Sequence, residues 1–169
     1  MHSTLHIRPM IGAVLAIMLG VLVISVSSCG RATSSASTTR STSVADMLKF
    51  LPNLNAIDVV SADYAVTKDS ASRGVPSPSD IRMELLGTAD LSEDAAKKLQ
   101  HSFEWKAANR KDIPAKILSI LPSGDYQVST KLNDSFSGNP TYAHGRVVVV
   151  AGNWGRLYFL ASDRDHPIE

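Results

Sequence analysis

The side chain of this sequence best suited to proton transfer is His144. Tyr142 lies two residues before it, and a turn-rich segment that contains Asp134 and Asn139 precedes both. Histidine is the natural proton shuttle because its ordinary pKa lies close to neutral pH. The grouping predicts either a hydrolytic site centred on His144 or a histidine at the start of a strand, bonded to the backbone. We favour the second interpretation.

Two other groups carry donors that suit a metal ion. His101 and Glu104 are one helical turn apart, but they fall on the polar side of their segment and no third ligand is near. The second group follows residue 162 and consists of Asp163, Asp165, His166 and Glu169. Its oxygen and imidazole donors suit a divalent ion, but a frayed terminus does not hold ligands in fixed positions around a metal. We therefore expect no metal and no other cofactor.

The motifs of common enzymes are missing from the sequence. It has no Gly-x-Ser-x-Gly elbow, no phosphate-binding loop ending in Lys and Ser or Thr, and no His-Glu-x-x-His. We therefore expect a non-enzymatic binding or envelope protein, with a tethered hydrolase that uses His144 as the alternative. Aromatic side chains bury a large area at small entropic cost, so they are enriched at interfaces. The candidate partner-binding residues are Trp154, Trp105, Tyr142 and His144.

Cys29 is the only cysteine, and its surroundings suggest a use for it. A start that contains Arg8 and no acidic residue precedes an apolar run over residues 11–25, and Val26-Ser27-Ser28-Cys29 follows. A positive leader, an apolar core and a small-residue exit are the three parts of a secretory signal. The four-residue exit resembles the lipobox of bacterial lipoprotein precursors. That resemblance implies a diacylglycerol on the Cys29 sulfur and cleavage just before Cys29.

The whole precursor resembles the small uncharacterised lipoproteins of high-GC Gram-positive bacteria. This resemblance implies a lipid-anchored protein on the extracytoplasmic face of the cell membrane, with the bilayer as one partner and an envelope protein or glycan as another. Two alternatives stay open. The apolar run is about as long as the ~20 residues that a spanning helix needs, so it can also be an uncleaved anchor. It can also be an ordinary cleaved signal in which Cys29 is incidental.

Composition divides the chain and excludes one class of partner. We expect a signal peptide over residues 1–28, an acylated cysteine with a flexible Ser/Thr-rich tether over 29–42, and one globular domain over 43–169. The tether lacks apolar periodicity and large side chains. The formal net charge is +1, and Arg8 alone supplies that excess. A balanced charge argues against nucleic acid as a partner, because phosphate binding needs accumulated Lys and Arg.

Periodicity in the domain predicts three helices. The first covers residues 44–51 behind Ser43 as N-cap, the second begins after Ser92, and the third spans 114–121. Polar residues 67–79, with one glycine and two prolines, indicate a surface loop, and residues 132–140 indicate turns.

Alternating or unbroken apolar runs predict the strands. They lie at residues 57–60 with 64–66, at 80–86, at 126–130, and at 146–151 and 156–161. The last two read as a hairpin of central strands, because unbroken apolar runs are covered on both faces. The predicted fold class is α+β: an antiparallel sheet of four to six strands with helices packed on one face.

Overall fold

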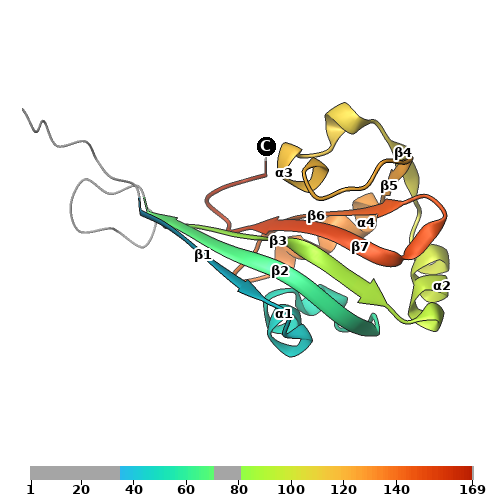
Figure 1. Ribbon diagram of the computed structural model, residues 1–169, viewed down its shortest axis with the longest axis horizontal. Helices are drawn as coiled ribbons and strands as arrows, with labels where there is room; N and C mark the ends of the chain where they lie inside the picture. The colour runs from blue at the N-terminus through green and yellow to red at the C-terminus, as the bar shows by residue number, and fades with distance from the viewer. Residues whose placement is uncertain (1–34, 71–80, 169) are drawn as a thin grey trace, which may run out of the picture. The chain divides into compact units, whose positions relative to one another are not determined.

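Seven strands form one antiparallel sheet in the order β1-β2-β3-β7-β6-β5-β4 (Figure 1). This computed structural model describes residues 35–70 and 81–168. The strands are β1 (Ser35–Ser41), β2 (Val59–Ser70), β3 (Ile81–Leu91), β4 (Lys106–Ala108), β5 (Tyr126–Val128), β6 (His144–Val150) and β7 (Asn153–Ser162). The predicted α+β class with an antiparallel sheet is confirmed, with more strands than expected. Cys29 and the signal before it lie outside the described residues.

Three of the helices pack against one face of the sheet. Helices α1 (Val44–Phe50), α2 (Glu93–Ser102) and α4 (Thr130–Asp134) pack there on the larger core, to which they contribute Met47, Leu99 and Leu132. The four-residue helix α3 (Ala115–Leu118) lies on the opposite face and buries Ile117 in a second, smaller core. Successive residues of a strand alternate between faces, so Val147 and Val149 join the first core while Val148 joins the second.

Local signals place several elements as predicted. The Ser43 hydroxyl accepts a hydrogen bond from the Asp46 amide, and the Ser92 hydroxyl accepts one from the Ala95 amide. Each serine thus caps its helix as expected. The 3-10 helix η1 (Pro52–Leu54) follows α1 directly. The hairpin of β6 and β7 forms, and β7 is the central strand of the sheet.

The predicted tether is wrong for residues 35–41, because they form the edge strand β1. All seven residues of β1 pair with β2, from Ser35 opposite Ser70 to Ser41 opposite Tyr64. An edge strand needs backbone pairing with one neighbour only, so polar residues with few apolar contacts can form it. The predicted loop over 67–79 is likewise strand as far as Ser70, and residues 71–80 lie outside the described part.

Two predictions in the second half of the domain are also wrong. The Ser129 hydroxyl accepts from the Leu132 amide, so α4 and the 3-10 helix η4 (Ser135–Gly138) replace the expected turns. Residues 163–168 are packed instead of frayed. The Asp163 amide donates to the Met83 carbonyl at 3.1 Å, and the Asp163 carboxylate accepts from the Met83 amide. Ile168 packs against the smaller core.

Close packing requires glycine at one position of β6. A Cβ on Gly145 would lie 2.1 Å from Cγ of Phe136, whose ring is fully buried. Gly145 therefore makes room for the aromatic ring that follows α4.

Candidate functional site

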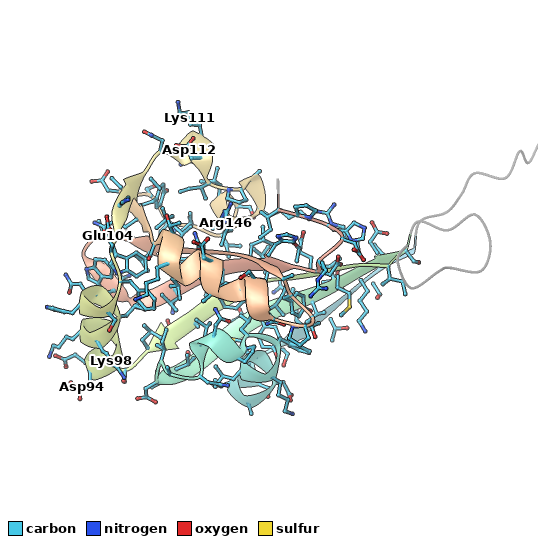
Figure 2. All side chains as sticks on the ribbon, turned by 180° about the vertical axis from the view of Figure 1, so that it is seen from behind. Asp94, Lys98, Glu104, Lys111, Asp112 and Arg146 are labelled. Carbon is cyan, nitrogen blue, oxygen red and sulfur yellow. The ribbon has the colours of Figure 1, made fainter. Side chains whose placement is uncertain are left out.

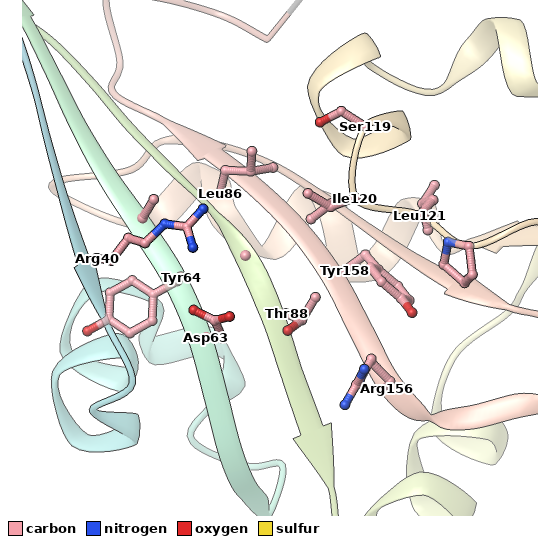
Figure 3. Close-up of a pocket in the computed structure, with 13 residues that line it drawn as sticks. Arg40, Asp63, Tyr64, Leu86, Thr88, Ser119, Ile120, Leu121, Arg156 and Tyr158 are labelled. Carbon is pink, nitrogen blue, oxygen red and sulfur yellow. The ribbon is translucent and has the colours of Figure 1, made fainter.

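The second face of the sheet is partly open and holds a groove. Helix α3 and the segment after it cover β6 and β7, while the described residues leave the same face of β1, β2 and β3 free of helices (Figure 1). A hollow of about 550 Å³ lies between the two regions. We call it the open-face groove; its lining includes Arg40, Asp63, Leu86, Thr88, Leu121 and Tyr158 (Figure 3). Its volume falls within the usual range of ligand sites, roughly 300–1,000 Å³.

The floor and one wall of the groove are apolar. Leu86 of β3 and Ala65 of β2 form the floor, where they lie opposite each other in register. Ile120 and Leu121 form the wall, and both pack against the smaller core. They follow α3, whose buried Ile117 holds this segment over the sheet.

The opposite wall carries two charged side chains of opposite sign. Arg40 comes from β1 and Asp63 from β2, and both extend towards the groove (Figure 3). Both are exposed, and neither makes a hydrogen bond or ion pair with another residue of the described ranges 35–70 and 81–168. Such charges are available to a ligand without the loss of an existing contact.

A third charge in the groove is already paired. The Arg156 guanidinium donates to both carboxylate oxygens of Asp90, its register partner on β3, and the Ser61 hydroxyl donates to the same carboxylate. The hydrogen bonds from Arg156 hold the pKa of Asp90 below its ordinary value, against the effect of burial, and Ser61 adds to the lowering. Arg156 therefore closes one end of the groove as part of a neutral pair.

The structure leaves His144 near Asp134 but separates it from the side chains of Asn139 and Tyr142. Nε2 of His144 lies 3.1 Å from the Arg164 carbonyl, so the ring bonds to backbone as in the favoured interpretation. His144 and Asp134 line one hollow of about 200 Å³. Asn139 instead bridges backbone groups, since it donates to the Phe50 carbonyl and accepts from the Tyr142 amide.

Tyr142 is not a surface residue. It is fully buried and packs edge-on against Phe50 at 5.8 Å between ring centroids, so it cannot contact a partner of the folded chain. Its hydroxyl has no hydrogen-bond partner among the described residues. Burial, and to a smaller extent the negative charges of Asp163 and Tyr64, raise the pKa of Tyr142 to about 12.

The two tryptophans lie together, which their separation in the sequence did not indicate. Their ring centroids are 5.1 Å apart at 72°, and Phe103 packs edge-on against Trp105 at 6.3 Å. Both tryptophans are half-buried against the larger core, and Trp105 Nε1 donates to the Leu99 carbonyl at 3.2 Å. This cluster holds the end of α2 onto the sheet, and its outer side remains partly open to solvent.

The other candidates make local contacts. His101 Nδ1 lies 2.7 Å from the Lys97 carbonyl, and Glu104 pairs with Lys106 at the surface (Figure 2). His166 lies 2.7 Å from Asp163. Within the described residues, no three His, Cys, Asp or Glu side chains gather as a metal site would require. No helix in that part of the chain is both long and apolar enough to span a membrane.

The sequence reasoning missed the residues of the open-face groove. Arg40 lies in the predicted tether, and Asp63 lies in the interruption between two short predicted strands. The alternation of Ala62, Tyr64 and Val66 with polar neighbours was the available signal for one long strand. The groove must be interpreted from its own residues, because no family model matches the chain and neither a curated protein nor a solved structure is significantly similar to it.

Proposed function

We propose that this chain is a non-enzymatic binding protein that is anchored by lipid at Cys29 and holds its ligand in the open-face groove. The observation that carries the binding role is the groove itself: an apolar floor and wall face two charges of opposite sign, neither of which is paired with another described residue. A concave apolar surface with a few convergent polar groups is the common form of a ligand site. The groove offers affinity through its apolar side and orientation through its charged side.

The anchor is supported by the sequence around Cys29. Val26-Ser27-Ser28 before it matches the small-residue exit of a lipoprotein signal, and the apolar run with Arg8 ahead of it matches export. Each buried methylene contributes about 0.8 kcal/mol, so one acyl chain holds weakly and two hold firmly. Such an anchor places the binding domain on the extracytoplasmic face of the cell membrane.

Labelling with an alkyne-bearing fatty acid in a bacterial host tests the anchor. Wild-type chain is expected to take up the label and to stay with the membrane fraction. Cys29→Ala is expected to lose the label, because it lacks the sulfur that is acylated. Equal labelling of the two chains, or an unlabelled wild type, would refute the anchor.

Photo-crosslinking tests the groove with a matched pair of positions. Ser119 lines the groove and Ser137 lies in η4, near the other face; both are exposed and each donates to the carbonyl three residues before it. A photoreactive residue at 119 is expected to capture a reproducible adduct in cells, and one at 137 is expected not to capture it. Identical adducts at both positions, or none at 119, would refute binding in the groove.

A further inference from the structure

The spacing of the two unpaired charges limits the size of the ligand. Arg40 is the register partner of Ala65, so Asp63 is its diagonal neighbour on β2. The Cα atoms of diagonal neighbours in an antiparallel pair lie roughly 7–8 Å apart, and this distance separates the bases of the two side chains. An extended chain covers at most about 3.3–3.6 Å per residue, so a dipeptide separates its ammonium and carboxylate by roughly 7 Å. A zwitterion of this length matches the spacing of the two strand positions, and the long, exposed Arg40 side chain can adjust to meet its carboxylate.

The signs of the charges determine how such a ligand lies. A guanidinium binds a carboxylate with paired hydrogen bonds, so Arg40 suits the carboxylate end. The carboxylate of Asp63 suits the ammonium end. Arg156 cannot serve as a second anion anchor without the loss of its contacts to Asp90. The free charges therefore favour a zwitterion over a ligand with only negative charge.

The apolar side of the groove determines the side chains of the ligand. Leu86 on the floor and Ile120 and Leu121 on the wall face the charged pair across the hollow. Aliphatic side chains bury apolar area there at about 25 cal/mol per Å². A sugar fits less well, because stacking needs an exposed aromatic face and both tyrosines of the lining, Tyr64 and Tyr158, are buried (2% and 5% exposed).

We infer that the open-face groove binds a short zwitterionic peptide of dipeptide size with aliphatic side chains. Its carboxylate lies at Arg40, its ammonium at Asp63 and its side chains against Leu86 and Leu121. This inference rests on the proposed function and adds the chemical class of the ligand.

Calorimetric titration of the full chain in detergent tests the inference with four probes. Leucyl-leucine is expected to bind in the sub-millimolar range. N-acetyl-leucyl-leucine and leucyl-leucine amide each lack one charge and are expected to bind about fivefold more weakly, as for an exposed ion pair. Seryl-serine keeps both charges but has little apolar area to bury, so it is expected to bind more than about tenfold more weakly.

Variants assign each charge to one end of the peptide. Asp63→Asn is expected to weaken leucyl-leucine about fivefold and to leave the N-acetyl peptide unchanged, because the interacting ammonium is already absent. Arg40→Gln is expected to weaken leucyl-leucine about fivefold and to leave leucyl-leucine amide unchanged, because the interacting carboxylate is already absent from the amide. The matched controls are Asp94→Asn on α2 (Figure 2) and Arg110→Gln in the 3-10 helix η3 (Arg110–Asp112); neither residue lines the groove. Neither control is expected to change any affinity.

Failure of the inference is distinguishable from failure of the proposed function. If no zwitterionic aliphatic peptide binds, but a photoreactive residue at position 119 still captures a reproducible adduct in cells, the peptide inference is overturned and the groove remains a binding site. Equal binding of leucyl-leucine and its N-acetyl form, or of leucyl-leucine and seryl-serine, overturns it as well. If position 119 captures nothing and no peptide binds, both are overturned.

Discussion

Removal of one hydroxyl group from the core should stabilise this protein. Tyr142 is fully buried, and its hydroxyl has no partner among the described residues. A buried polar group without a partner costs about 1–3 kcal/mol. Tyr142→Phe removes that group and keeps the ring, so the free energy of unfolding at neutral pH should rise by about 1 kcal/mol. Urea unfolding followed by tryptophan fluorescence measures the change.

Tyr126→Phe is the matched control, because it makes the same chemical change where the hydroxyl is paired. The Tyr126 hydroxyl donates to the Pro122 carbonyl at 2.9 Å. Its removal should therefore lower the free energy of unfolding by about 1 kcal/mol. The two variants are expected to shift stability in opposite directions. A loss of 1 kcal/mol or more in Tyr142→Phe would refute the reasoning, because it would mean that the hydroxyl is paired in the folded chain.

Alkaline pH provides a second readout of the same residue. Burial raises the pKa of Tyr142 from 10.0 to about 12. Between these two values the unfolded chain releases the phenol proton while the folded chain keeps it, so stability falls as pH rises. Each pH unit in this window costs up to about 1.4 kcal/mol, and the whole window about 2–3 kcal/mol. Tyr142→Phe should lack this loss, so its advantage over wild type should widen above pH 10. A constant difference across the window would contradict the assignment.

Two further predictions concern a close packing contact on β6 and a partly buried ion pair of β3. Gly145→Ala places a Cβ 2.1 Å from the buried Phe136 ring and should lower the free energy of unfolding by about 1–3 kcal/mol in urea unfolding. Gly138→Ala is the control, because its Cβ meets no atom within 4 Å. Its free energy of unfolding should stay within about 0.5 kcal/mol of wild type. Lys116→Met removes the contacts at 2.6 and 2.8 Å from the Glu84 carboxylate, which is 7% exposed, and leaves it the Arg82 guanidinium at 3.8 Å. It should lower the stability by about 1–2 kcal/mol, and a second change, Glu84→Leu, should restore most of the loss in thermal unfolding; no recovery would show that the ion pair is not the cause.

Predictions from the sequence succeeded where a signal was local and complete. Ser92 caps α2 because its hydroxyl reaches an amide three residues later, and both residues are visible in one short window. The hairpin of β6 and β7 combines two long apolar runs with a turn at Gly152, whose φ of 81° suits glycine. The α+β fold class follows from such segments together.

Elements that depend on distant partners could not be predicted in the same way. Strand β1 has no apolar pattern of its own, and its pairing with β2 is what makes it a strand. The groove is missed for the same reason, because Arg40, Asp63 and Leu121 meet only after three separate segments have packed. The chemistry of its imidazole alone makes His144 a candidate for proton transfer, and nothing in the sequence indicates that the Arg164 carbonyl lies beside it.

The position of β7 imposes an order on how this protein acquires its structure. β7 follows the other six strands in the chain, yet it lies between β3 and β6 and joins the two halves of the sheet. During synthesis, β3 pairs with β2 on one edge, while its other edge waits for a neighbour more than sixty residues downstream. Before β7 leaves the ribosome, the chain can pair β1-β2-β3 and β4-β5-β6 as two separate sheets, but it cannot join them. The proposed export, if it takes place in an extended state, suits this topology, since the two halves of the sheet join only after β7 is added.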